Sequence, residues 1–288
     1  MEKETITNYV FQSDSECVRK LRKTSGNYSI EIDNSALQKD LCVVYFSSNA
    51  IYYPNNEKNF THSIVEKDYY EWRNAVPIKA HKQIFVRDIY KQWYLQGIND
   101  VINTPPELLK FLKKNTAGYR VITIGSSAGG YAAILYGCLL NAEKVFAFNA
   151  QFELSSLLPK GEQVNPILIR KKDDPIVKRF YDIVPYLNGI PIYYFMSDRS
   201  DWDNSQRIHL HNNHSVRVIR FSTAHHGVPF PKVAIPYVMQ ASSKRLDALP
   251  GKRYNPIMFS IKFAGLFKTM MGIINQYTGA MKKKLRNR

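Results

Sequence analysis

The stretch VITIGSSAGGYAAILYGCLLNAEKVFAFNA, residues 121–150, contains a serine flanked by small residues between two apolar runs. The β-branched residues before the serine predict a strand over 119–125, and the alanine-rich run predicts a helix over 127–141. KVFAFNA predicts a second strand over 144–150. Residues 125–129 match the pattern G-x-S-x-G at the junction of strand and helix. This pattern in this place predicts a nucleophile elbow with Ser127 on a sharp turn.

Two other kinds of functional glycine-rich turn are excluded by the residues present. A phosphate-binding loop needs a lysine after its glycines, and none follows here. A dinucleotide-binding turn needs G-x-G-x-x-G, which is also absent. A turn that is small only because strand and helix pack tightly stays open at this point.

Short apolar runs recur along the chain and alternate with segments of helical spacing. This alternation is typical of a mostly parallel sheet covered by helices on both faces, so we predict an α/β fold. Near the N-terminus, residues 17–35 turn at Ser-Gly-Asn and predict a β-hairpin. The remaining predicted strands cover 41–48, 83–88, 191–197 and 216–222, and the remaining helices cover 105–115, 205–213 and 232–246.

Acidic and histidine side chains follow two of the later strands. Asp198, Asp201 and Asp203 come after the strand 191–197, and His225 and His226 come after the strand 216–222. In open parallel sheets the functional groups collect at the carboxyl ends of the strands. The order serine, acid, histidine is the order in which triad partners follow a nucleophile elbow.

Residues 40–245 resemble the α/β-hydrolase superfamily on these motifs. In that superfamily the acid often stands in a G-x-x-D turn, which, laid on DRSD, implies Asp201 as the acid and puts Asp198 in the glycine's place. Asp198 therefore remains an alternative. The last strand is often followed by a small-residue turn and His-Gly, which in TAHHG implies His226 as the base, with His225 as the alternative.

The roles of these residues follow from the chemistry of a triad. Ser127 attacks an acyl carbonyl, His226 takes its proton, and Asp201 holds the imidazole in the required tautomer. The amide of Ala128, at the start of the helix, is expected to stabilise the oxyanion. The second oxyanion donor is expected from the loop 47–50, and Ser47 is our candidate.

The acyl acceptor is not determined by a triad. GSSAGG followed by a strand ending in FNAQFEL resembles a branch of bacterial capsule polysaccharide O-acetyltransferases. The resemblance implies transfer of acetyl from acetyl-CoA, as a co-substrate, to a hydroxyl of a polysaccharide. We expect no tightly bound cofactor and no metal. The alternatives are an esterase or deacetylase with the same triad, and a non-catalytic, membrane-associated polysaccharide assembly factor.

Positive charge is concentrated at the C-terminal end. The chain has 40 Lys and Arg against 24 Asp and Glu, and its net charge is +16. Residues 244–288 contain seven Lys and four Arg but one Asp, a net charge of +10. Apolar residues between Phe259 and Ile274 recur at three- and four-residue steps, while Lys262 and Lys268 interrupt any membrane-spanning run. We expect a basic amphipathic helix that binds an anionic membrane surface, and no nucleic-acid partner, since no recognition motif accompanies the charge.

These patterns divide the chain into two parts. Residues 1–250 are predicted to form the catalytic domain, with the polar segment 160–185 as an insertion or lid, and residues 251–288 form the basic helical tail. The polar N-terminus shows no secretory pattern, and three cysteines match no metal or disulfide spacing. We therefore expect a cytoplasmic protein, peripheral at the inner face of the cytoplasmic membrane.

Overall fold

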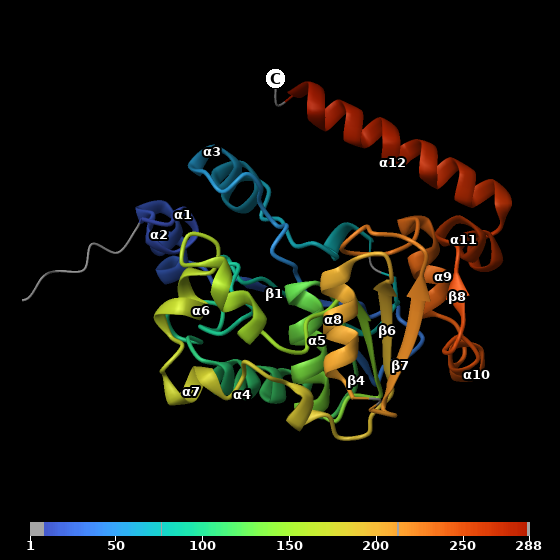
Figure 1. The fold of residues 1–288 in the computed structure, drawn as a ribbon, viewed down its shortest axis with the longest axis horizontal. Coiled ribbons are helices and arrows are strands. Elements are labelled where there is room, and N and C mark those ends of the chain that lie inside the picture. Colours follow the sequence, from blue (N-terminus) through green and yellow to red (C-terminus); the bar gives the residue numbers. More distant parts are fainter. Residues whose placement is uncertain (1–8, 76, 212, 287–288) are drawn as a thin grey trace, which may run out of the picture.

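An eight-stranded sheet runs through the centre of the computed structural model, which describes residues 9–75, 77–211 and 213–286 (Figure 1). Its strand order is β1-β3-β2-β4-β5-β6-β7-β8, and within these residues β1 is the strand that runs antiparallel to its neighbour. The strands are β1 (Tyr28–Ile32), β2 (Leu41–Phe46), β3 (Lys82–Val86), β4 (Arg120–Ser126), β5 (Lys144–Phe148), β6 (Ile192–Ser197), β7 (Val216–Phe221) and β8 (Arg253–Tyr254).

The central strands are buried on both faces, as their near-continuous apolar sequences predict. All six residues of β2 and of β6 are buried. Helices cover the sheet on both sides (Figure 1). In chain order they are α1 (Phe11–Asp14), α2 (Glu16–Thr24), α3 (Glu57–Phe60), α4 (Pro105–Thr116), α5 (Ala128–Leu139), α6 (Pro166–Arg170), α7 (Pro175–Lys178), α8 (Asp201–His209), α9 (Ile235–Met239), α10 (Ser243–Asp247), α11 (Pro256–Ala264) and α12 (Leu266–Arg286).

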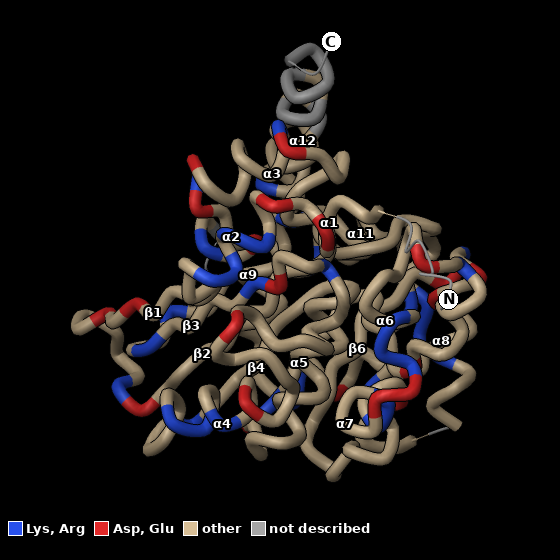
Figure 2. The backbone as a smooth tube through the Cα atoms, turned by 90° about the vertical axis from the view of Figure 1, so that its left-hand side faces the viewer, with Lys and Arg blue, Asp and Glu red and all other residues tan. Residues whose placement is uncertain are grey.

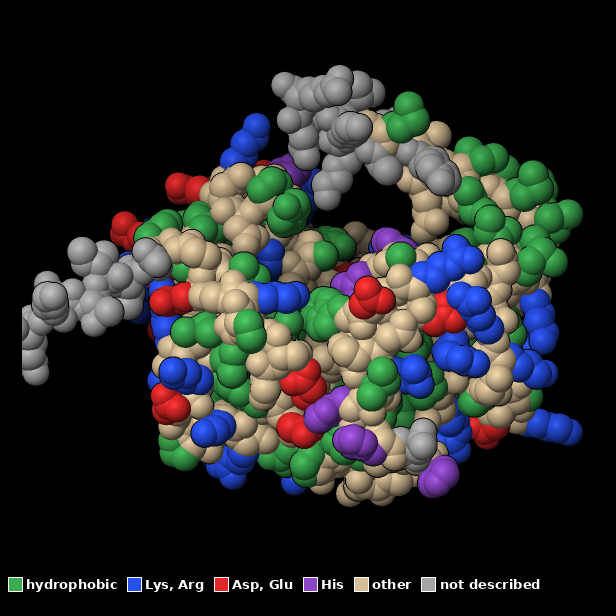
Figure 3. Space-filling view, viewed as in Figure 1, with side chains coloured by type: hydrophobic (Ala, Val, Ile, Leu, Met, Phe, Trp, Pro, Cys, Tyr) green, Lys and Arg blue, Asp and Glu red, His purple; other side chains and the backbone are tan. Residues whose placement is uncertain are grey.

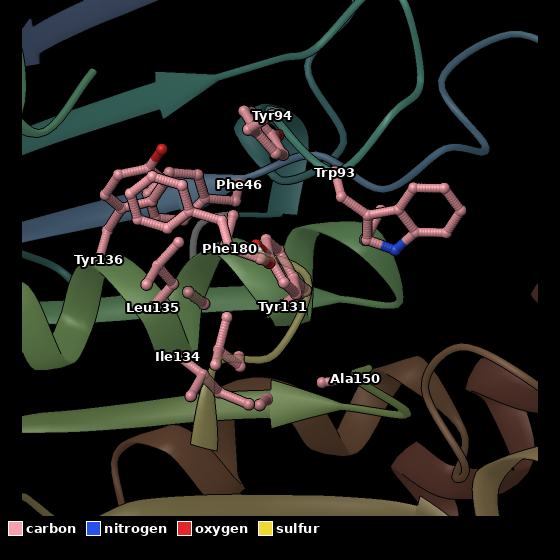
Figure 4. Packing of buried hydrophobic residues seen from close by; sticks show 14 of the residues in the cluster. Phe46, Trp93, Tyr94, Tyr131, Ile134, Leu135, Tyr136, Ala150 and Phe180 are labelled. Carbon is pink, nitrogen blue, oxygen red and sulfur yellow. Dashed lines mark hydrogen bonds between the residues drawn. The ribbon is translucent and has the colours of Figure 1, made fainter. Parts of the chain in front are cut away.

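Helix α5 is the centre of the core on one face of the sheet. It is apolar all round, and every residue from its start to Cys138 is buried. Figure 4 shows Tyr136 of this helix beside Phe46 of β2, and the two rings stack with centroids 5.6 Å apart. Apolar residues of α4, α6 and α7 pack into the same core.

Helices α9, α10 and α11 cover the opposite face. Phe259 of α11 packs edge-on against Phe221 of β7, with ring centroids 4.8 Å apart, and Phe230 contacts both rings. Val43 and Tyr45 of β2 point into this second core. The two cores confirm the predicted α/β architecture, because the same strands are covered on both faces.

The predicted N-terminal β-hairpin is wrong. Residues 16–24 form the helix α2, in which Val18 and Arg22 lie four residues apart and are both buried. Only the second half of the predicted hairpin, Tyr28–Ile32, is a strand. It pairs with β3 across the sheet and not with the preceding segment, so the turn at residues 25–27 leads from a helix into an edge strand.

Three other segments differ from the predicted elements. The predicted helix 232–246 is divided into the 3-10 turn η5 (Lys232–Ala234), α9 and α10. The predicted single tail helix ends at Gly265, whose φ of +85° breaks it into α11 and α12. The polar segment 160–185, for which no helix was predicted, contains the short helices α6 and α7, which bury Ile167, Leu168 and Val177.

Candidate active site

Ser127 lies at the junction of β4 and α5 in a strained conformation. Its φ and ψ are +52° and −122°, a region that non-glycine residues rarely occupy, and it stands directly before the first residue of the helix. The backbone is held there because the Ser127 N–H donates to Phe148 O at 2.8 Å and its carbonyl accepts from Tyr131 N at 3.0 Å. The strand, sharp turn and helix together form the nucleophile elbow that the sequence predicts.

The flanking glycines allow the close approach that this turn needs. A Cβ at Gly125 would lie 2.0 Å from the carbonyl oxygen of Gly129, and a Cβ at Gly129 would lie 2.3 Å from that of Phe46. No side chain fits at such distances, since backbone atoms cannot move aside as a flexible side chain can. The turn is therefore tightly packed as well as strained, and it has the geometry both of an elbow and of a close-packed turn.

His226 joins Ser127 to a buried carboxylate. The Oγ of Ser127 lies 2.8 Å from Nε2 of His226, and Nδ1 of the same ring lies 3.1 Å from Oδ1 of Asp203. Asp203 is fully buried, whereas the His226 side chain is 33% exposed, so the ring has one side toward the protein and one open to a substrate. An Nδ1–H that donates to Asp203 leaves Nε2 free to accept the serine proton.

Asp203, and not the predicted Asp201, is the carboxylate at His226. Asp201 is the exposed first residue of α8, whose N-cap is Ser200, and it does not contact the histidine. Since successive helical residues turn by 100°, residues 201 and 203 project from nearly opposite sides of the helix. The alternative Asp198 is engaged elsewhere, with its Oδ2 2.5 Å from Nε of Arg253. Asp203 reaches His226 because α8 begins at residue 201, whereas the sequence predicted a helix that begins near residue 205.

Asn149 positions the loop that carries His226, a role that the sequence analysis missed. Its fully buried amide donates to the carbonyl oxygens of His225 and Gly227, at 3.1 and 2.9 Å, and accepts from the N–H of Ser197 at 2.7 Å. The Ser197 hydroxyl also donates to the His225 carbonyl. One asparagine thus ties the ends of β5 and β6 to the carbonyls of the two residues on either side of the histidine. An asparagine at the end of an otherwise apolar strand was the sequence feature that could have indicated it.

The His226 ring stacks on Trp202, with centroids 5.0 Å apart and planes 22° from parallel. Lys160, at the end of the 3-10 turn η3 (Ser155–Lys160), places its Nζ 4.4 Å from the centroid of the same indole. The adjacent His225 has an exposed side chain that does not reach Ser127. Partial desolvation, with His226 and Lys232 nearby, lowers the pKa of His225.

The two predicted oxyanion donors have different surroundings. Ala128 is the first residue of α5, where an N–H has no partner within the helix and points outward from its positive end. Ser47 does not fit the predicted role, because its N–H donates to Val86 O at 2.9 Å as a continuation of the β2–β3 pairing. The next amide in this loop, that of Ser48, is the candidate for the second position.

The N–H of Ser48 already donates a hydrogen bond to a carboxylate. Glu71 accepts from Ser48 N at 2.6 Å through Oε2 and from the hydroxyl of Ser126 at 3.1 Å through Oε1. It thus bridges the loop after β2 and the residue next to Ser127. The loop has other supports, because the hydroxyl of Tyr94 donates to Ser47 O at 2.8 Å and the indole N–H of Trp72 donates to Phe46 O at 3.1 Å. Nothing in the sequence around residue 71 pointed to this contact.

Within the described residues, no group of three or more His, Cys, Asp or Glu side chains is arranged to hold a metal ion. The arrangement of Ser127, His226 and Asp203 can instead activate a hydroxyl nucleophile. The strand order, with the antiparallel strand at the edge next to β3 and the elbow after β4, is that of an α/β-hydrolase fold.

Comparison with known proteins gives structural matches only. No family model matches the chain, and no curated protein matches it in sequence. The capsule O-acetyltransferase of Neisseria meningitidis serogroup A is similar at 11% identity over 68% of this chain and 83% of that chain, with a TM-score of 0.49. A mutant of that enzyme in complex with CoA, at 12% identity over the same shares, has a TM-score of 0.43. Fluorophosphonate-binding serine hydrolase F of Staphylococcus aureus matches at 11% identity over 67% of this chain and 83% of that chain, with a TM-score of 0.44.

Proposed function

We propose that this protein is a serine-dependent acyltransferase whose triad is Ser127, His226 and Asp203. The observation that carries the proposal is the unbroken chain of contacts from the serine Oγ through both ring nitrogens of His226 to a fully buried carboxylate. A serine that served only to pack the turn would need neither the histidine nor the acid. The strained backbone at Ser127 supports the same reading.

The reaction begins with the proton on the serine. His226 Nε2 takes this proton while Oγ attacks the carbonyl carbon of an acyl donor, and the resulting imidazolium is stabilised by Asp203. The tetrahedral intermediate collapses when Nε2 returns the proton to the leaving group, which departs and leaves an acyl ester on Ser127. An acceptor hydroxyl then loses its proton to His226, attacks the ester, and carries the acyl group away. Nε2 finally returns the proton to Oγ.

The acyl donor and acceptor that we propose are acetyl-CoA and a bacterial capsular or surface polysaccharide. This part rests on the resemblance of GSSAGG and FNAQFEL to capsule polysaccharide O-acetyltransferases. The cationic Lys160 contacts the indole of Trp202, which stacks on His226. A positive charge at this place supports an anionic donor such as acetyl-CoA. With water as the acceptor, the same triad would make the protein an esterase or deacetylase.

The experiment mixes the purified protein with acetyl-CoA and O-deacetylated capsular polysaccharides and follows acetyl groups by NMR. Transfer predicts new O-acetyl resonances on the glycan, and Ser127→Ala should remove them. The exposed Ser35→Ala, a matched serine distant in sequence from the triad, should leave them unchanged. Release of free acetate without acetylated glycan from any polysaccharide would favour the esterase, and activity that survives in Ser127→Ala would refute the triad.

A further inference from the structure

Helix α12 presents an apolar face that no described residue covers. At 100° per residue, five of its side chains fall within an arc of about 100°, and all of them are exposed by 44% or more. These residues, called here the apolar face, are Phe267, Met270, Met271, Ile274 and Met281. The exposed fraction of Phe267 reaches 77%. Figures 1 and 2 show, from two directions, that α12 projects away from the rest of the molecule.

The opposite side of α12 fixes which way this face points. Thr269 is fully buried, and a Cβ at Gly272 would lie 2.6 Å from the Val233 side chain, so these positions pack against η5. Lys268 Nζ donates to the Tyr237 hydroxyl at 2.7 Å. The first turns of α12 are therefore anchored on the body, and the apolar face is turned outward as a consequence.

Helix α11 extends the apolar surface and basic residues border it. Ile257 and Met258 of α11 and Leu266 at the start of α12 are exposed by 49, 63 and 59%. Figure 3 shows hydrophobic side chains gathered over this corner of the molecule, with Lys and Arg on the surface beside them. Lys252 and Lys262 are exposed here. The basic run at residues 282–288 follows in the sequence, and its side chains lie outside the described part.

We propose that the apolar face of α12 binds the surface of an anionic lipid membrane. Phenylalanine, methionine and isoleucine side chains on one face, with a basic border, match a helix that lies in the interface between headgroups and acyl chains. Because its apolar residues lie on one side, α12 would lie along the membrane surface. Within the described residues no helix is long and apolar enough to cross a bilayer. A second copy of the chain is a poorer partner. A two-fold contact through α12 would bring together two copies of residues 244–288, each with a net charge of +10.

The location of α12 gives the membrane contact a functional consequence. Its anchor at Val233 lies in η5, seven residues after His226 in the chain. Figure 1 shows β7 running toward the end of the molecule from which α12 projects, and the histidine loop follows β7. A protein docked through α12 therefore holds its catalytic edge at the membrane surface, where a lipid-linked acceptor would be presented.

The test is co-sedimentation of the full chain with vesicles of phosphatidylcholine alone and of an equimolar mixture with phosphatidylglycerol. We expect binding to the mixed vesicles, weakened by about tenfold or more when Phe267→Ser is combined with Ile274→Ser. The matched control combines Leu37→Ser with Val101→Ser, which are apolar residues elsewhere with still larger exposed fractions, and should bind like wild type. Lys252→Glu with Lys262→Glu should weaken binding, unlike Lys110→Glu with Lys114→Glu on α4.

Thermal unfolding and light scattering of each variant accompany the binding data. Because all the substituted side chains are exposed, the melting temperatures should not change. Ser127→Ala should bind vesicles like wild type, so a failure of the proposed chemistry would leave this test intact. Absence of binding to mixed vesicles, or equal binding by the Phe267 and Ile274 double variant, would overturn the proposal. So would a dimer that this variant dissociates in the absence of lipid, since the face would then be a contact between copies.

Discussion

The Oγ of Ser127 and the Nε2 of His226 lie 2.8 Å apart, although the two residues are separated by 99 positions in the chain. Two parallel strands, β4 and β7, end at the same edge of the sheet and bring the two residues together. Asp203, in the first turn of α8, contacts the other ring nitrogen of His226. The contact depends on the strained turn at Ser127 and on the hydrogen bonds that Asn149 makes around the histidine loop.

The acid is tested by comparing two aspartates two residues apart. Asp203→Asn should lower kcat by roughly 10³–10⁴, because an asparagine in this place favours the wrong imidazole tautomer. Asp201→Asn, on the exposed side of the same helix, should leave kcat unchanged. Steady-state turnover of a small acyl ester measures both. Equal losses in the two variants would contradict the assignment of Asp203.

Asn149 is predicted to be a positioning residue. Asn149→Ala removes the donor to the Gly227 carbonyl and the acceptor of the Ser197 N–H, and leaves the His225 carbonyl with the Ser197 hydroxyl as its donor. This loss should cost about 1–3 kcal/mol in the free energy of unfolding. Turnover at a temperature where the variant is fully folded should also fall, because the His226 ring loses its fixed orientation. Chemical unfolding together with steady-state turnover of a small acyl ester checks this. A destabilised variant that turns over the ester like wild type when folded would show that Asn149 only stabilises the fold.

Glu71 is predicted to restrain the reaction with small substrates. Its carboxylate occupies the Ser48 N–H, and the loop keeps its other hydrogen bonds when the carboxylate is removed. Glu71→Ala should therefore free an oxyanion donor and remove a negative charge, raising the turnover of a small ester by roughly tenfold, less than the roughly 10²–10³ attributed to one fully used donor. Glu57→Ala, an exposed glutamate at the start of α3, is the control. A loss of turnover would show that Glu71 supports the loop and does not block it.

Lys160 is predicted to select an anionic acyl donor. Lys160→Glu should raise KM for acetyl-CoA by about fivefold, the size expected from one exposed charge interaction, and leave KM for a neutral ester unchanged. Lys172→Glu, an exposed lysine of the same insertion, should change neither constant. Steady-state kinetics with both donors provide the comparison. Equal effects on the two donors would mean that Lys160 acts on the indole of Trp202 and through it on His226.

The sequence alone predicted the elbow and most of the sheet because both depend on local patterns. Glycine spacing and β-branched runs identify Ser127, and the apolar runs place β2 to β7 within a few residues of their observed bounds. The acid could not be chosen in this way, because the face on which an aspartate projects depends on where α8 begins. The contacts of Asn149 and Glu71 join segments that are far apart in the chain, so local patterns do not reveal them. The same holds for the pairing of β1 with β3.

The C-terminal tail shows the same division between local pattern and tertiary contact. Apolar spacing predicted one amphipathic stripe, but Phe259 and Phe263 are buried in the core while Met270 and Ile274 face outward. Gly265 separates the two groups, and the packing of Thr269 against the body decides the direction of the second. Periodicity identifies that a helix has an apolar side, and only the neighbouring elements determine what that side faces.

The most direct test of the catalytic claim is covalent labelling of the folded protein with a fluorophosphonate probe, followed by peptide mass mapping. The triad predicts one modified residue, Ser127, with labelling abolished in Ser127→Ala and strongly slowed in Asp203→Asn and His226→Ala. Labelling of another serine, or no labelling of folded wild-type protein, would contradict an activated nucleophile at this position.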